Sequence, residues 1–197
     1  EIRAPAGTKY GVSGFQIKFG STDILTPGDT CDVLVAMNPA ALVTNVKILR
    51  DGGTIIVNED AFNDKNFKLA NIATNPLEDG SLVAYKIYAA DISGLTGTAL
   101  AELGLGPKAV DRSKNFFALG LVSWMYSRPT DPTVRWIGQK FNSKPPIRDA
   151  NLAAFRAGFN FGETAELLQV SFQVKAAPAE PGTYRAVNGS TATAIGL

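Results

Sequence analysis

The 197-residue chain contains no histidine and a single cysteine, Cys31. Without histidine, the most common general base and transition-metal ligand is missing, so any chemistry has to use carboxylates, lysines or a cofactor held elsewhere. One cysteine excludes a disulfide within the chain and a cysteine-ligated zinc or iron–sulfur site built from this chain alone. Cys31 begins an apolar run, which favours a small buried side chain over a reactive thiol. We therefore predict no catalytic residue and no metal site here.

The sequence also lacks an excess of charge and long hydrophobic runs. Lys and Arg number 19 against 18 Asp and Glu, so the net charge of +1 gives none of the broad positive field that non-specific nucleic-acid binding needs. No apolar run approaches the roughly 20 residues of a membrane-spanning helix, and no basic and then apolar leader precedes the first loop. We expect a cytoplasmic protein that binds neither nucleic acid nor membrane.

Familiar nucleotide and hydrolase motifs are missing as well. The glycines Gly104 and Gly106 are followed by Pro107, so they do not form a G-x-G-x-x-G loop that opens a helix. There is no P-loop and no G-x-S-x-G nucleophile motif. A self-sufficient nucleotide enzyme or hydrolase is therefore disfavoured.

Buried strands and helices alternate along the chain. Strands are predicted over 12–19, 31–38, 54–60 and 82–93, and helices from Pro39 to a stop at Gly52 or Gly53 and over 61–73, 96–104, 111–128, 133–141 and 148–166. Residues 167–174 either close the sheet or pack on it. Near-continuous apolar strands between helices are typical of a sheet covered on both faces. The prediction is an α/β fold, a three-layer α/β/α sandwich with a mostly parallel (mixed) sheet.

The composition changes after residue 175. The stretch 176–197 begins as a Pro/Ala linker and finishes on small residues. We interpret 1–175 as one α/β domain and 176–197 as a linker and the start of a following domain.

Asn38 and Asn58 each end a predicted buried strand. At the carboxyl edge of an open α/β sheet they could hydrogen-bond a ligand. Helix initiation is the stronger interpretation for Asn38, because Asn is a favoured N-cap and Pro39 suits the first helical position.

A cluster of Arg112, Ser113, Lys114 and Asn115 lies in the first turn of the helix predicted from Asp111. With exposed helix N–H groups it could hold a phosphate or a partner's carboxylate. A plain cap with solvated charges is the simpler account, so the anion site is a hypothesis.

Five blocks resemble one family: EIRAPAGTKYGVSGFQIKF, DVLVAMNPAAL, GGTIIVNEDAF, DRSKNFFALGLVSWMY and PGTYRAVNGSTATAIGL. The chain is similar to the gamma domain of 2-oxoacid:ferredoxin (acceptor) oxidoreductases, at the N-terminal end of the fused gamma-alpha subunit of the 2-oxoglutarate type. The strand–helix segment that precedes the Arg-Ala-Pro block in that family is missing here. The resemblance implies that the closing block leads into a pyrimidine-binding domain. This block also differs, because Asn188 and Gly189 stand in the opposite order to the family's pattern.

The resemblance implies a subunit of an enzyme that converts a 2-oxoacid to acyl-CoA, or runs the reverse reductive carboxylation, and is inactive as an isolated chain. It implies thiamine diphosphate, Mg²⁺, a 4Fe-4S cluster and coenzyme A in the complex, with no cofactor bound by this chain alone. The implied partners are the remaining alpha-type domains, the beta subunit and ferredoxin as electron partner. The gamma domain is implied to serve assembly and the coenzyme A side of the site.

On this resemblance, Arg112, Ser113, Lys114, Asn115 and Asn38 are candidates for the coenzyme A side. Arg3, Gly7 and Thr8 are candidates for a loop that faces the active centre. Two alternatives stay open, namely a member that uses pyruvate or another 2-oxoacid and a subunit-docking module without a ligand.

Overall fold

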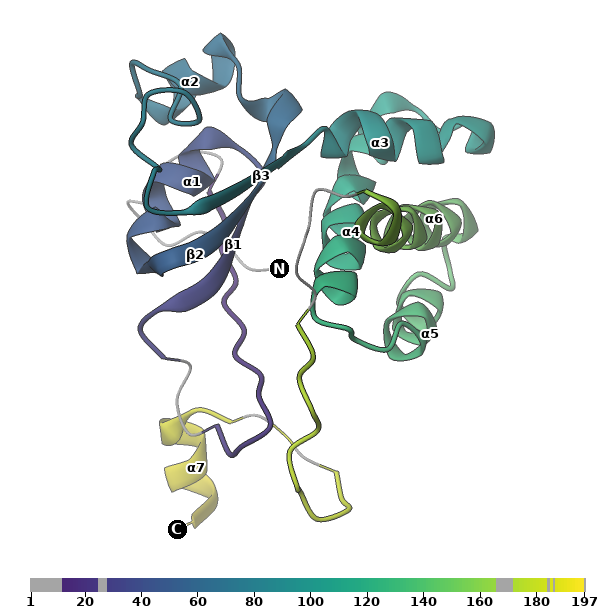
Figure 1. The fold of residues 1–197 in the computed structure, drawn as a ribbon. Helices are drawn as coiled ribbons and strands as arrows, with labels where there is room; N and C mark the ends of the chain where they lie inside the picture. Colours follow the sequence, from purple (N-terminus) through teal and green to yellow (C-terminus); the bar gives the residue numbers. More distant parts are fainter. Residues whose placement is uncertain (1–11, 25–27, 166–171, 184, 186, 197) are drawn as a thin grey trace.

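A computed structural model describes residues 12–24, 28–165, 172–183, 185 and 187–196 of the chain (Figure 1). The strands are β1 (Cys31–Ala36), β2 (Leu49–Asn58) and β3 (Lys86–Ala90). The helices are α1 (Pro39–Asn45), α2 (Asp64–Ala70), α3 (Ile92–Ala99), α4 (Pro107–Met125), α5 (Asp131–Lys140), α6 (Pro145–Thr164) and α7 (Gly189–Gly196). Short 3₁₀ turns cover Val46–Ile48, Glu59–Ala61 and Ala101–Leu103.

The three strands form one parallel sheet in the order β1-β2-β3. Leu34 pairs with Ile55 in one ladder, and Ile56 pairs with Tyr88 in the other. No antiparallel strand joins the sheet within the described part of the chain. The predicted α/β class is confirmed.

Helices cover both faces of the sheet, with α1 and α2 on one side and α3 to α6 on the other (Figure 1). On the first side, Leu42 of α1 packs in a cluster with Ile55 and Val57 of β2. On the second side, Leu121 and Met125 of α4 pack around Ile56. Alternate residues of β2 therefore serve two cores, as the near-continuous apolar sequence predicts.

Helices α4 and α6 pack with their backbones in direct contact. A Cβ at Gly120 of α4 would meet the Phe155 carbonyl oxygen, and a Cβ at Gly158 of α6 would meet that of Phe117. Glycine is required at both positions because any side chain would push the helices apart.

The predicted strand over 12–19 is wrong, because this segment is in no strand and forms no ladder with β1. Phe15 is 78% exposed and Ile17 66% exposed. The C-terminal end of the segment is anchored, since Phe19 packs edge-on against Tyr126 with ring centroids 5.0 Å apart. The alternation therefore marks an extended segment that is held at its ends by Val12 and Phe19 and leaves Phe15 and Ile17 exposed.

The helix predicted from Pro39 to Gly52 or Gly53 is much shorter, since α1 ends at Asn45 and β2 begins at Leu49. The register steps from Cys31↔Leu49 to Val33↔Thr54, so β2 carries extra residues at this point. Gly52 takes a positive φ of 70° within that excursion. These glycines thus shape an irregularity in a strand and do not end a helix.

Other boundaries shift by a few residues. β3 is shorter than the strand predicted over 82–93, α4 begins at Pro107 and not near Asp111, and α7 forms within the stretch predicted as a linker. Most of 167–174 lies outside the described residues, and Phe172 packs on Tyr126 with ring centroids 5.3 Å apart. No helix in the described residues is both long and apolar enough to cross a membrane.

Candidate functional site at the carboxyl edge of the sheet

The three parallel strands end at one edge of the sheet, where β2 ends on Asn58 and where Asn38 and Asp91 follow β1 and β3. Ligands of open α/β sheets usually bind outside this edge. We therefore expect a ligand-binding site at this edge.

Two of these side chains cap helices. Asn38 Oδ1 accepts a hydrogen bond from the Ala41 amide at 2.8 Å, which confirms the predicted N-cap of α1. Asp91 Oδ1 accepts from the Gly94 amide at 2.7 Å and caps α3. Side chains at the carboxyl edge of the sheet therefore accept hydrogen bonds from the first-turn N–H groups of α1 and α3.

Asn58 is fully buried and reaches the first turn of α3. Its Oδ1 accepts from the Ser93 amide at 3.1 Å, and its Nδ2 donates to Ser93 Oγ at 3.0 Å. Ser93 Oγ also donates a long hydrogen bond of 3.4 Å back to Asn58 Oδ1, and an acceptor on a ligand would compete for this proton. Asn58 thus orients the Ser93 hydroxyl.

A cavity of about 370 Å³ opens beside Ser93, between α3 and the first turns of α4. We call it the edge cavity. Its lining consists of Ser93, Gly97, Leu100, Ala101, Leu105, Pro107, Val110, Asp111 and Lys114. An apolar wall with a few convergent polar groups is typical of a small-molecule site.

Lys114 supplies the cation of the edge cavity. Its Nζ lies 2.6 Å from Asp111 Oδ1, and the lysine side chain is 25% exposed. An anion that entered the cavity would compete with Asp111 for this ammonium group and could also accept from Ser93.

The structure divides the predicted cluster around helix α4. Lys114 lines the edge cavity, whereas Ser113 is buried against α6, where its Oγ donates to Asn151 Oδ1 at 3.0 Å. Arg112 and Asn115 are exposed. Because α4 begins at Pro107, these residues lie beyond its first turn, and the expectation of exposed helix N–H groups beside them was wrong. Ligand binding by any of them, or by Asn38, stays a prediction.

Ser93 was missed by the sequence reasoning. The usable signal was Asp91 as a cap with Ser93 two residues later, directly after a buried strand. The predicted loop residues Arg3, Gly7 and Thr8 lie outside the described residues.

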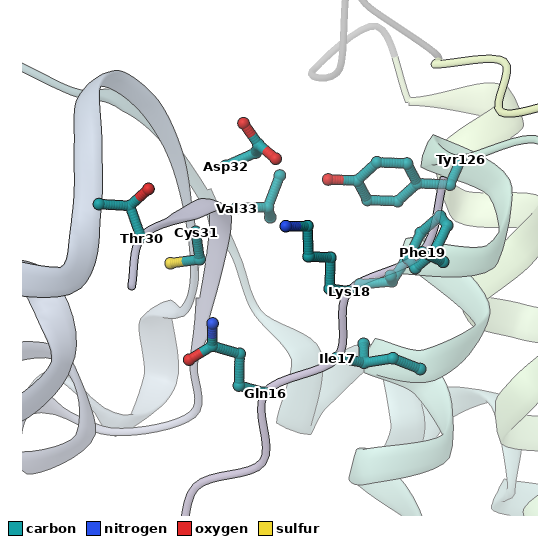
Figure 2. A pocket seen from close by; sticks show the side chains of 10 residues that line it. Gln16, Ile17, Lys18, Phe19, Thr30, Cys31, Asp32, Val33 and Tyr126 are labelled. Carbon is teal, nitrogen blue, oxygen red and sulfur yellow. The ribbon is translucent and has the colours of Figure 1, made fainter. Parts of the chain in front are cut away.

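A second cavity, of about 180 Å³, lies at the opposite, amino edge, between residues 16–19 and the start of β1. Figure 2 shows the Lys18 amino group and the Tyr126 hydroxyl directed toward β1. Burial raises the pKa of the Cys31 thiol, and the Asp32 carboxylate raises it further. Burial also raises the Tyr126 pKa, again with a contribution from Asp32. Both groups therefore stay protonated at neutral pH and are poor nucleophiles.

Metal donors are scarce in this chain. The described residues contain no group of three His, Cys, Asp or Glu side chains placed to hold a metal ion. The complete sequence offers one cysteine and no histidine. These donors do not fit an iron–sulfur cluster, which needs several cysteine thiolates.

Comparison with known proteins decides the family. Residues 4–161 match the family described as pyruvate ferredoxin/flavodoxin oxidoreductase. The chain belongs to this family. The match covers most of the sequence, including all three strands and helices α1 to α5.

One relative is a subunit of a 2-oxoglutarate oxidoreductase. The chain is 47% identical to 2-oxoglutarate oxidoreductase subunit KorA of Mycobacterium tuberculosis over 197 residues, which is 100% of this chain and 30% of that protein. The chain therefore spans less than a third of this relative's length.

Two solved structures resemble this chain. The 2-oxoglutarate:ferredoxin oxidoreductase from Magnetococcus marinus matches 80% of this chain and 24% of its own, with a TM-score of 0.54 and 20% sequence identity. The gamma subunit of a keto/oxoacid ferredoxin oxidoreductase from Geobacter sulfurreducens matches 68% of this chain and 66% of its own, with a TM-score of 0.45 and 19% identity. The first of these supports the α/β architecture of this chain.

Proposed function

We propose that this chain is a domain of an enzyme that oxidatively decarboxylates 2-oxoglutarate to an acyl-CoA, or runs the reverse reductive carboxylation. The observation that carries the proposal is the 47% identity, along the whole chain, to a 2-oxoglutarate oxidoreductase subunit. The Magnetococcus marinus enzyme was solved with 2-oxoglutarate, coenzyme A and succinyl-CoA bound, which is consistent with this substrate class.

The bond-breaking chemistry belongs to other parts of the enzyme. Thiamine diphosphate with Mg²⁺ would supply decarboxylation, and a 4Fe-4S cluster would pass electrons to ferredoxin. One cysteine and no histidine do not fit a cluster, and the described residues place no three metal donors together, so we assign no such step to this chain. The remaining alpha-type domains and the beta subunit are the proposed holders of these groups, in a cytoplasmic complex in which this chain is inactive alone.

The proposed contribution of this chain is assembly and one wall of the coenzyme A site. Coenzyme A carries phosphate anions, and the edge cavity offers the Lys114 ammonium group beside the Ser93 hydroxyl. Asp111 holds Lys114 in place until an anion replaces it. Asn58 acts indirectly, because it fixes the orientation of Ser93.

The experiment uses the complete enzyme with 2-oxoglutarate, coenzyme A and an electron acceptor. We expect succinyl-CoA formation with acceptor reduction, and a KM for coenzyme A that rises in Lys114→Ala while kcat changes less. Lys108→Ala is the matched control, because Lys108 is an exposed cation on the same helix and does not line the edge cavity. Equal KM values in both variants would refute the coenzyme A assignment.

A pyruvate enzyme is the second candidate, because the family is described by pyruvate. A comparison of kcat/KM for pyruvate, 2-oxoglutarate and a branched 2-oxoacid decides the substrate. Turnover by the isolated chain would contradict its proposed role as a part of a larger enzyme.

A ligand-free docking module is the third candidate, since Phe15 and Ile17 are exposed on an extended segment. In that case Phe15→Ser with Ile17→Ser would weaken subunit assembly, and Lys114→Ala would leave the KM for coenzyme A unchanged.

A further inference from the structure

A third cavity, of about 270 Å³, lies between α4, the end of α5 and the start of α6. We call it the α4–α6 cavity. Its apolar wall includes Leu105, Ala109, Phe116, Phe141, Ile147 and Ala150. Phe116 and Phe141 meet edge-on there, with ring centroids 5.9 Å apart. The wall therefore suits an apolar ligand body, including a flat one.

This cavity is distinct from the edge cavity. Leu105 lines both, but Arg112 belongs to the α4–α6 cavity and Lys114 to the edge cavity. The two cations thus lie on different sides of the same helix and serve different spaces.

A buried polar pair forms part of the lining. Ser113 is 2% exposed and Asn151 3% exposed. Ser113 Oγ contacts both Asn151 Oδ1, at 3.0 Å, and the Ala109 carbonyl, at 3.2 Å. With Oδ1 facing Ser113, the Asn151 Nδ2 group has no hydrogen-bond partner within the described part of the chain.

The Asn151 Nδ2 group is not one of the fully enclosed unpaired atoms, because it is reachable from the cavity. Because Asn151 lines the cavity, an acceptor atom on a ligand would satisfy its Nδ2 group. The structure thus contains a donor for which the surrounding residues provide no acceptor.

Arg112 lines the same cavity and has an exposed side chain. It forms no ion pair with any described acidic residue, since the neighbouring Asp111 is paired with Lys114. A guanidinium group can donate two parallel hydrogen bonds to one carboxylate. The Ser113 hydroxyl is already bonded to Asn151 and Ala109, so the two polar groups that remain for a ligand are donors, and one of them is charged.

We infer that the α4–α6 cavity binds a small carboxylic acid with an apolar body. The carboxylate accepts hydrogen bonds from Arg112 and Asn151, and the body lies against Phe116, Phe141 and Ile147. The volume lies just below the usual range for ligand sites, so the ligand is much smaller than a nucleotide. This inference is independent of the proposed function, because the edge cavity is a separate space.

The experiment uses the complete enzyme and ligand-observed NMR with isothermal titration calorimetry. The probes are hexanoate and 3-phenylpropionate, each compared with its uncharged primary amide. We expect both acids to bind with 1:1 stoichiometry per copy of this chain and each amide at least about tenfold more weakly, because it loses the ion pair with Arg112. Absence of binding by both acids, or equal affinity for an acid and its amide, overturns the inference.

Three variants locate the binding. Ala109→Phe fills the cavity and is expected to abolish binding, with Ala109→Leu as a smaller replacement if the first does not fold. Arg112→Gln is expected to weaken acid binding about tenfold, whereas Lys108→Gln, an exposed cation one turn earlier on α4 that does not line the cavity, is expected to leave the affinity unchanged. Unchanged affinity in folded Ala109→Phe or Ala109→Leu protein would overturn the assignment to this cavity.

Discussion

Gly158 of α6 lies directly on the backbone of Phe117 in α4, so that a Cβ at residue 158 would also meet the Phe117 carbonyl carbon at 2.7 Å. Gly120 has the reciprocal relationship to Phe155. The obstacles are backbone atoms, which cannot move aside like the end of a flexible side chain. The two glycines therefore set the separation of α4 and α6.

We predict that Gly158→Ala lowers the stability of this domain by roughly 1–3 kcal/mol, through overpacking between α4 and α6. Gly138→Ala in α5 is the matched control, because a Cβ there meets nothing within 4 Å. The control should be neutral or more stable, by up to about 1 kcal/mol of helix propensity. Thermal unfolding with hydrogen exchange at α4 and α6 measures both variants. Equal effects of the two would contradict the packing argument.

A second prediction concerns Asn58. Asn58→Ala removes the acceptor of the Ser93 amide and the donor to Ser93 Oγ, so it should cost about 1–3 kcal/mol and increase hydrogen exchange in the first turn of α3. Ser93→Ala should cost less, because its backbone amide still donates to Asn58 Oδ1. Thr98→Ala is an exposed control on the same helix and should be nearly neutral. A neutral Asn58→Ala would show that the buried pair contributes little.

Elements with strong local signals could be predicted from the sequence. The apolar run at β1 and the Asn38-Pro39 pair that starts α1 were both read correctly, because burial on two faces and helix capping leave local traces. The Gly106-Pro107 pair was read as a break, although proline is suited to the first position of a helix, and α4 begins there.

Features that depend on distant residues were predicted wrongly or missed. Leu49 continues a predicted helix by local propensity but pairs with Cys31 in the sheet, and this tertiary contact decides its structure. The alternation at Phe15 and Ile17 indicates a strand but cannot show whether a sheet edge accepts it. The candidate site also depends on a contact between distant residues, because Asn58 and Ser93 form a hydrogen bond although they are 35 residues apart in sequence.

A third prediction concerns the cap of α1. Asn38→Ala removes the oxygen that accepts from the Ala41 amide and should cost about 1 kcal/mol, whereas Asn38→Asp keeps an acceptor and should retain most of the stability. The coenzyme A role of Asn38 is tested in the same variants through the KM for coenzyme A. A rise in KM with both substitutions, including the stable Asn38→Asp protein, would support ligand contact beyond capping.

The fourth prediction concerns the pH dependence of Cys31. Burial first, and then the Asp32 carboxylate, raise the pKa of this thiol above its ordinary value. The resulting stabilisation is fully present below the ordinary thiol pKa and is lost as the pH rises through the higher pKa of the folded state. Because the thiolate is the reactive form, Cys31 should be alkylated more slowly than a free cysteine near pH 8 to 9.

Asp32→Asn should speed this alkylation, since it removes a negative charge and frees Arg50, whose Nε lies 2.8 Å from Asp32 Oδ1. Asp29→Asn removes an equal charge close in sequence that does not contribute to the Cys31 pKa shift, so it should leave the rate unchanged. Mass spectrometry of the Cys31 peptide after timed iodoacetamide treatment at several pH values gives the rates. If Asp32→Asn and Asp29→Asn react alike, burial alone controls the thiol and the Asp32 charge has no measurable influence on it.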